Sequence, residues 1–212
     1  LIYDSAMTES VRRFTYLELY DHVGRVAGMM VTQGVEAGDR VLVYMPMVPE
    51  AVFAMLACAR LGAIHAVVFG GFAAAELAKR IEDATPKLVL TASCGLEPGR
   101  VVAYKPLLDD AIALSTHKPD SCIVLQRPQC TALLMPGRDI DWTEAVAAAP
   151  HADCVTVASG DPLYILYTSG TTGIPKGVVH DNGGHAVALS WSLPNIYGVQ
   201  PGETFWSASD IG

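Results

Sequence analysis

The sequence predicts an α/β fold in which parallel strands are covered by helices. Short apolar, β-branched runs alternate with segments of helical period between residues 16 and 91. Glycine or proline stands where most of these segments should end. Hydrophobic residues make up 51% of the 212 residues and charged residues only 17%, which is typical of a globular chain with a sizeable core.

Strand and turn are expected over residues 1–14, before the first helix at about 16–33. Thr15 and Glu18 form a T-x-x-E capping box at the start of this helix. Apolar side chains then recur at helical spacing along it. Residues 40–45 are an apolar, β-branched run that suits a buried strand.

Helix and strand should alternate in the next part of the chain. We expect helices over residues 51–61 and 73–84 and strands over residues 64–69 and 87–91. Pro49 stands where the first of these helices can begin, because the first helical position needs no N–H donor. This alternation at short spacing is the pattern of a parallel sheet covered by helices.

The middle of the chain has more turn residues and shorter elements. We expect a turn-rich loop over residues 93–100, a helix over 107–114, a strand over 121–125 and an exposed connection over 126–140. Asp141 should cap a short helix that begins at Trp142.

The last third should begin with a strand after Asp161-Pro162. We then expect a strand over residues 176–180, a helix over 183–193 that Pro194 ends, a turn over 200–203 and a strand over 204–207. We predict two α/β subdomains, residues 1–150 and residues 151–212.

The stretch from Tyr167 to Gly177, here called the phosphate loop, combines hydroxyl side chains, glycines and one lysine. Backbone N–H groups that glycine leaves accessible, hydroxyl donors and an ammonium can together hold a polyphosphate. The candidate phosphate-binding residues are Thr168, Ser169, Gly170, Thr171, Thr172, Gly173, Lys176 and Gly177. The alternative is an ordinary polar hairpin loop. The stretch is not a Walker A loop, because Lys176 follows proline and precedes glycine.

Charge and cysteine content exclude several classes of partner. A net charge of −8 argues against nucleic acid as a partner, and no apolar stretch reaches the roughly 18 residues that span a membrane. The five cysteines show no C-x-x-C pair, which favours a reducing compartment. Three of them, Cys58, Cys122 and Cys154, lie in apolar runs and are expected to be buried. No cysteine and histidine form a metal-binding spacing, so we predict no metal site formed by this chain.

Residues 168–177 closely resemble the phosphate loop of the AMP-forming acyl-CoA synthetases, which belong to the adenylate-forming superfamily. The shared pattern is two hydroxyl residues, Gly, a hydroxyl residue, Thr, Gly, any residue, Pro, Lys and Gly. Gly70-Gly71-Phe72 with Arg80-Ile81-x-Asp83, and the segment 206–212, resemble the short-chain branch of that family. The resemblance covers essentially the whole chain and implies an internal fragment of the large N-terminal domain of these enzymes.

In this branch a coenzyme A site directly follows the Arg80-Ile81-x-Asp83 segment and the strand after it. The resemblance therefore implies that Glu97, Pro98, Gly99 and Arg100 are candidate coenzyme A-binding residues. Arg100 is the candidate for the 3′-phosphate, and the alternative is an ordinary exposed turn arginine. Acetyl-CoA synthetases usually have another arginine at the position of Glu97. The Glu-Pro-Gly-Arg loop is more similar to the propionyl-CoA synthetase subgroup, with acetyl-CoA synthetase as a near relative.

The resemblance implies a two-step ligase. ATP and a short-chain carboxylate give an acyl-adenylate and pyrophosphate, and the thiol of coenzyme A then displaces AMP. Lys176 is the candidate catalytic residue, because its cation can offset charge on the leaving pyrophosphate. Mg²⁺ is expected with the triphosphate, held by a family glutamate beyond residue 212.

Three questions remain open at this point: which acid is activated, whether the chain catalyses turnover, and where it is located. The acid can be propionate, which we favour, or acetate or another short acid. A truncated product can act as a nucleotide-binding or interaction module without turnover, and the chain as given should be inactive, because family residues needed for the full reaction lie after Gly212. Cytoplasm and mitochondrial matrix both fit, and the oligomeric state is not predicted.

Overall fold

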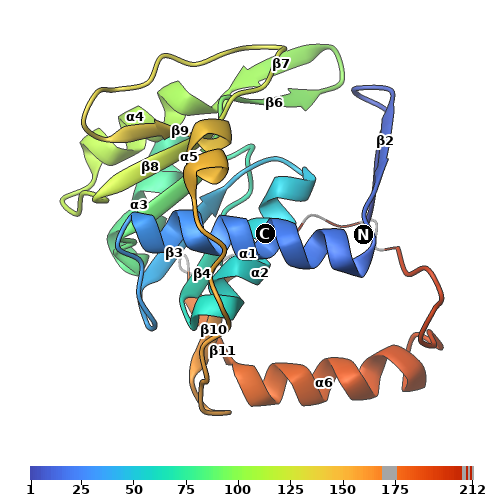
Figure 1. Ribbon diagram of the computed structural model, residues 1–212. Coiled ribbons are helices and arrows are strands. Elements are labelled where there is room, and N and C mark those ends of the chain that lie inside the picture. The colour runs from blue at the N-terminus through green and yellow to red at the C-terminus, as the bar shows by residue number, and fades with distance from the viewer. Residues whose placement is uncertain (169–175, 207–208, 210, 212) are drawn as a thin grey trace.

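A mainly parallel sheet forms the centre of the computed structural model, which describes residues 1–168, 176–206, 209 and 211 (Figure 1). Within this described part the sheet has seven strands in the order β11-β10-β4-β3-β5-β8-β9. They are β3 (Arg40–Tyr44), β4 (Ile64–Val67), β5 (Leu88–Ala92), β8 (Ser121–Leu125), β9 (Asp139–Asp141), β10 (Pro162–Thr168) and β11 (Lys176–Asp181). Neighbours from β10 to β9 are parallel, and only β11 runs antiparallel to its neighbour among these strands. The predicted α/β fold is confirmed.

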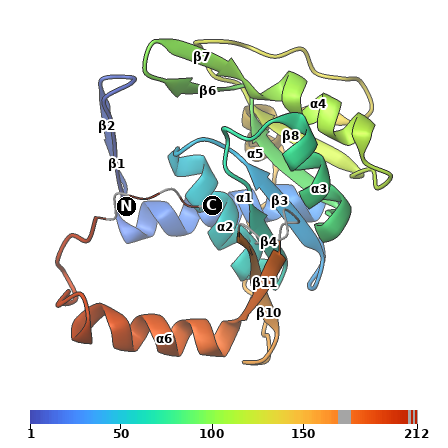
Figure 2. The same cartoon turned by 180° about the vertical axis from the view of Figure 1, so that it is seen from behind.

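Helices cover both faces of this sheet (Figures 1 and 2). They are α1 (Tyr16–Thr32), α2 (Pro49–Leu61), α3 (Ala74–Ala84), α4 (Tyr104–Leu114), α5 (Trp142–Ala148) and α6 (Asn182–Asn195). α1, α2 and α5 lie on one face, and α3 and α4 pack together on the other. α6 follows β11 and has no buried side chain.

Strand alternation divides the apolar core between the two faces. On β3, Val41 and Val43 belong to the cluster under α1 and α2, whereas Leu42 and Tyr44 belong to the cluster under α3 and α4. Side chains one residue apart on a strand point to opposite faces. A strand buried on both faces is therefore apolar at successive positions, as residues 41–45 are.

Local signals set several element ends as expected. The Thr15 side chain accepts a hydrogen bond from the Glu18 N–H, and the Glu18 carboxylate accepts one from the Thr15 N–H. Asp141 caps α5 by accepting from two N–H groups of its first turn. Gly62 ends α2 in the left-handed conformation with φ 65°, which glycine adopts without a steric cost. Two short strands, β1 (Ile2–Ser5) and β2 (Ser10–Arg13), form the expected strand and turn at the start.

Four local expectations were wrong. The predicted loop over residues 93–100 contains β6 (Cys94–Glu97), which pairs with β7 (Arg100–Ala103) in an antiparallel hairpin. The connection over 126–140 ends in the edge strand β9. α6 continues past Pro194 to Asn195. Residues 204–206 of the predicted strand 204–207 pair with no described strand, and Ser207 lies outside the described residues.

The segment after α5 packs along α1 and α2. The Ala152 N–H donates to the Gly24 carbonyl (3.0 Å), and the Arg60 guanidinium donates to the Ala152 carbonyl (2.7 Å). A Cβ at Gly28 would lie 1.6 Å from the Pro150 carbonyl oxygen, so only glycine permits this approach. The subdomain boundary that we predict at residues 150 and 151 falls in this extended segment. Among the described residues, no helix has the length and apolarity to cross a membrane.

Candidate functional site

The phosphate loop connects β10 with β11. Thr168 and Lys176 lie directly opposite each other in this antiparallel pair, and Tyr167 lies opposite Gly177. Thr168 and Lys176 are exposed, and within the described residues Lys176 forms no ion pair. An exposed lysine ammonium is a mobile cation of the kind that binds phosphates. Five predicted phosphate-binding residues lie outside the described part of the chain: Ser169, Gly170, Thr171, Thr172 and Gly173.

The predicted phosphate loop and the predicted coenzyme A loop leave the same edge of the sheet. The phosphate loop follows the carboxyl end of β10, and the β6–β7 hairpin follows the carboxyl end of β5. β10, β4, β3 and β5 are parallel, so their carboxyl ends share one edge. Ligands of open α/β sheets bind at this edge. Two strands, β4 and β3, separate the two loops.

The predicted coenzyme A loop is the turn of the β6–β7 hairpin. Glu97 and Arg100 are cross-strand partners, and Pro98 and Gly99 form the two-residue turn between them. Gly99 has φ 77°, and proline followed by such a glycine is typical of a type II turn. The Arg100 guanidinium donates to the Glu97 carboxylate, with Nη2 and Nε 2.6 and 2.7 Å from Oε2. Arg100, the candidate for the 3′-phosphate of coenzyme A, is therefore paired with Glu97 across the turn.

Two side chains of α3 contact the strand that enters the phosphate loop. The Tyr167 hydroxyl donates to the Asp83 carboxylate over 2.6 Å. The Arg80 guanidinium lies 5.5 Å from the centre of the Tyr167 ring and 4.3 Å from that of Phe72. Burial and the hydrogen bond to Asp83 raise the pKa of Tyr167, so the phenol stays protonated and acts as the donor.

Tyr164 lies on the other face of β10, among three histidines. Its ring stacks between His180 at 4.5 Å and His65 at 5.4 Å, and its hydroxyl is 3.4 Å from Nδ1 of His185. His180 is half-buried by this stacking. His65 is buried, and its Nδ1 has no hydrogen-bond partner in the part of the chain that the structure describes. Burial first, and then the charge of His185, lower the pKa of His65 to about 4, so its imidazole is neutral.

The described residues contain no group of three His, Cys, Asp or Glu side chains that could hold a metal ion. Cys58 and Cys122 are buried free thiols as expected, but Cys154 is exposed, because its segment runs over the surface of α2.

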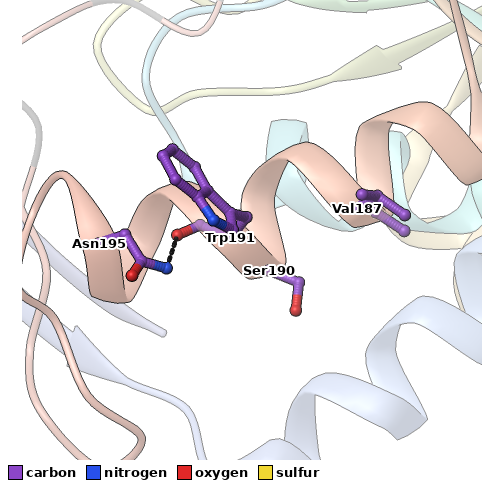
Figure 3. A pocket seen from close by; sticks show the side chains of 5 residues that line it. Val187, Ser190, Trp191 and Asn195 are labelled. Carbon is purple, nitrogen blue, oxygen red and sulfur yellow. Dashed lines mark hydrogen bonds between the residues drawn. The ribbon is translucent and has the colours of Figure 1, made fainter.

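Two surface pockets border α6. One, of about 480 Å³, is lined by Ala186, Val187, Ser190, Trp191 and Asn195, with the Asn195 amide donating to the Trp191 carbonyl (Figure 3). The other, of about 380 Å³, includes Tyr164, His180 and His185. Neither contains a predicted site residue. The sequence motifs therefore locate the candidate site better than these two surface pockets do.

Sequence reasoning missed two features of the site. The Glu97–Arg100 ion pair has a local signal, since opposite charges flank a Pro-Gly turn. The Tyr167–Asp83 bond joins residues 84 positions apart and has no local signal. Only the fold brings α3 against β10.

Comparison with known proteins gives one family over nearly the whole chain. The model of the family described as AMP-binding enzyme matches residues 3–212. An uncharacterized protein of Pseudomonas aeruginosa is 62% identical over the whole chain. The human protein named acyl-CoA synthetase short-chain family member 3, mitochondrial, is 54% identical, and the propionate–CoA ligase of Salmonella typhimurium is 49% identical. The chain spans 34%, 31% and 34% of the length of these three relatives.

The fold gives the same result. A crystal structure of an acyl-CoA synthetase of Brucella canis superposes on 97% of this chain with a TM-score of 0.80 and 27% sequence identity, and the chain covers 34% of that protein. The resemblance that the sequence motifs indicated is thus confirmed by sequence and by fold. The chain belongs to the AMP-binding enzyme family.

Proposed function

We propose that this chain is part of an AMP-forming acyl-CoA synthetase that activates a short-chain carboxylate, with propionate preferred. The observation that carries the proposal is the phosphate loop, which is bracketed by the opposed residues Thr168 and Lys176 at the carboxyl end of β10. An exposed ammonium and a hydroxyl flank a glycine- and hydroxyl-rich segment at the edge of the sheet where ligands bind.

In the first step a carboxylate oxygen of the acid bonds to the α-phosphorus of ATP, and the bond to the bridging oxygen of pyrophosphate breaks. Negative charge accumulates on the leaving pyrophosphate. The Lys176 ammonium is placed to offset this charge, and the Thr168 hydroxyl can donate a hydrogen bond to a phosphate oxygen. Mg²⁺ would supply further charge neutralisation when bound to the triphosphate.

In the second step the thiol sulfur of coenzyme A bonds to the acyl carbon, the thiol proton is lost and AMP leaves. We propose that Arg100 contacts the 3′-phosphate of coenzyme A, with Glu97, Pro98 and Gly99 shaping the turn. The Arg100 side chain is 68% exposed, which makes it accessible to a ligand at the tip of the hairpin. Its pair with Glu97 must open or rearrange for a phosphate to replace the carboxylate.

Two observations favour propionate over acetate. The Glu-Pro-Gly-Arg turn resembles the propionyl-CoA synthetase subgroup, and the chain is 49% identical to a protein named propionate–CoA ligase. The human relative is named as mitochondrial, which supports the matrix as one location, with the cytoplasm as the other. Short-chain carboxylate, ATP and coenzyme A are the proposed partners.

ATP–pyrophosphate exchange by the complete native protein tests this proposal. Labelled pyrophosphate should enter ATP only when a short acid is added, with kcat/KM highest for propionate among acetate, propionate and butyrate. A higher kcat/KM for acetate would overturn the propionate assignment. Absence of exchange with all three acids would refute the ligase function.

A module without turnover is the competing function for residues 1–212 by themselves. We expect this segment alone to give no exchange even where the complete protein is active. Carboxylate-dependent exchange by the isolated segment would show that it contains the whole adenylation site.

A further inference from the structure

A hydrogen bond ties α3 to the strand that enters the phosphate loop. The Tyr167 hydroxyl donates to Oδ2 of Asp83 over 2.6 Å. Tyr167 directly precedes Thr168, the residue opposite Lys176. The bond therefore anchors Tyr167, and Thr168, a candidate phosphate-binding residue, follows directly in the chain.

The opposite strand is shaped to let the tyrosine reach this partner. Gly177 lies across from Tyr167 in the β10–β11 pair. A Cβ at Gly177 would lie 3.2 Å from Cε1 of Tyr167, 3.4 Å from Oδ2 of Asp83 and 2.9 Å from Cγ2 of Ile165. The missing side chain leaves the space in which the ring crosses β11 and meets the carboxylate.

The ring is also supported from the side of α3. Arg80 is buried, and its Nη1 donates to the Glu76 carbonyl over 2.7 Å, which fixes the guanidinium against the helix. From there it lies over Phe72 and within 5.5 Å of the Tyr167 ring centre. Such cation–π contacts favour one ring position over others. Arg80 and Asp83 are one helical turn apart, so both reach the same strand.

We propose that Asp83 and Tyr167 are positioning residues that hold Thr168 and Lys176, two opposed candidate phosphate-binding residues, in place for adenylate formation. This inference rests on the proposed function. It assigns a role to the Arg80-Ile81-x-Asp83 motif, which neither the adenylation nor the coenzyme A chemistry uses directly.

The geometry separates this role from general stability. Asp83 is exposed and its bond to Tyr167 lies at the surface, so loss of the bond costs the fold little. A small displacement of a phosphate-binding residue lowers the rate steeply, because the charge on the leaving group must be met at a fixed distance. Adenylation should therefore be more sensitive to the bond than thermal stability is.

The test is a double-mutant cycle of Tyr167→Phe and Asp83→Ala in the complete native protein. Each single variant should slow propionate-dependent ATP–pyrophosphate exchange about tenfold, as expected for one hydrogen bond to a charged group. The double variant should be no more than about twofold slower than either single variant, since both remove the same bond. Thioester formation from supplied propionyl-adenylate should stay within about twofold of wild type.

Two further variants sharpen the result. Asp83→Asn keeps a side-chain oxygen that can accept the hydrogen bond, so it should recover most of the exchange rate that Asp83→Ala loses. Glu82→Gln is the control, because Glu82 is the neighbour of Asp83 on α3 and accepts hydrogen bonds from Thr116 and His117. It should leave exchange unchanged.

Wild-type exchange in either single variant, multiplicative effects in the double variant, or equal slowing of both half-reactions would overturn the inference. Amide hydrogen exchange gives a readout that does not require turnover. In Tyr167→Phe, amides of residues 164–168 and 176–179 should exchange faster, while those of β3 stay unchanged. If the wild-type protein shows no pyrophosphate exchange, the proposed function fails, and unchanged amide exchange in both strands would separately overturn the positioning role.

Discussion

Glu97 and Arg100 form an ion pair across a two-residue turn, with the guanidinium Nη2 2.6 Å from the carboxylate. The arginine proposed to bind the 3′-phosphate of coenzyme A is thus already neutralised by its cross-strand partner. A phosphate can bind there only in competition with the carboxylate. The pair is largely exposed, so the competition is weak and depends on salt.

Replacing Glu97 by Gln should strengthen coenzyme A binding. The KM for coenzyme A is expected to fall about two- to fivefold at low salt, because Arg100 no longer has a competing carboxylate. Arg100→Ala should raise this KM and leave propionate-dependent ATP–pyrophosphate exchange unchanged. Steady-state kinetics at two salt concentrations measures both effects. An unchanged KM in Arg100→Ala would remove Arg100 from the coenzyme A site.

A buried ion cluster should make a large contribution to stability. Lys105 is 3% exposed and lies 2.8 Å from the fully buried carboxylate of Asp139, which also pairs with Arg138. Lys105→Met should lower the free energy of unfolding by about 3 kcal/mol, because it leaves a buried carboxylate with one cation instead of two. Urea denaturation measures the loss. Arg25→Met, which removes an exposed pair with Asp21, is the control and should change little.

The same cluster predicts a loss of stability in acid. Burial alone would raise the pKa of Asp139, but the hydrogen bonds from Arg138 and Lys105 outweigh it and lower the pKa below the ordinary 3.8. Because the folded state binds this proton less readily, the contribution is complete above about pH 4 and is lost as the pH falls further. Asp139→Asn should flatten this part of the curve of melting temperature against pH. An equally steep curve in the variant would contradict the assignment.

The buried His65 predicts that the free energy of unfolding also depends on pH in a second, higher range. Burial lowers its pKa from the ordinary 6.5 to about 4, so the unfolded chain takes up a proton that the folded chain refuses. Stability should fall as the pH drops from about 6.5 to about 4, by on the order of 3 kcal/mol in total. His65→Phe keeps a ring against Tyr164 and removes the titrating imidazole. Chemical denaturation at several pH values should show a flatter profile for this variant, and an unaltered profile would place the titration elsewhere.

Gly177→Ala tests why glycine is needed beside the phosphate loop. The added methyl group would lie 2.9 Å from Ile165 and 3.2 Å from Tyr167, closer than ordinary contact allows. We expect a loss of about 1–3 kcal/mol in the free energy of unfolding, as is common for overpacked sites. Gly99→Ala is a useful contrast, because no atom of the described residues lies within 4 Å of a Cβ there, and φ 77° makes backbone strain the expected cost. Equal stability of Gly177→Ala and wild type would mean that the site has room.

Elements with strong local signals were predictable from the sequence. The capping box at Thr15 and the cap at Asp141 depend on residues within one helical turn of each other, so the pattern carries the structure. Residues 41–44 are buried on both faces of the sheet, and the apolar run that follows Arg40 is the local signal of such a strand. The phosphate loop was found because its residue types are rare in combination.

The features that the sequence did not reveal depend on distant partners. Residues 204–206 have strand-forming side chains, yet a strand needs a neighbour, and the described residues provide none. The sequence did not predict the β6–β7 hairpin, because Gly95, Pro98 and Gly99 favour a loop. The Pro98-Gly99 turn is nevertheless typical of a β-turn. Cys154 is exposed despite its apolar neighbours, since burial is decided by where the segment runs.

The central claim is that the phosphate loop holds pyrophosphate while the adenylate forms. Lys176→Ala in the complete native protein tests it, with the two half-reactions measured separately. Propionate-dependent ATP–pyrophosphate exchange should fall by about a hundredfold or more, in line with the loss of one charge-stabilising group, while thioester formation from supplied propionyl-adenylate should change much less. Equal slowing of both half-reactions, or an exchange rate like that of wild type, would contradict the account.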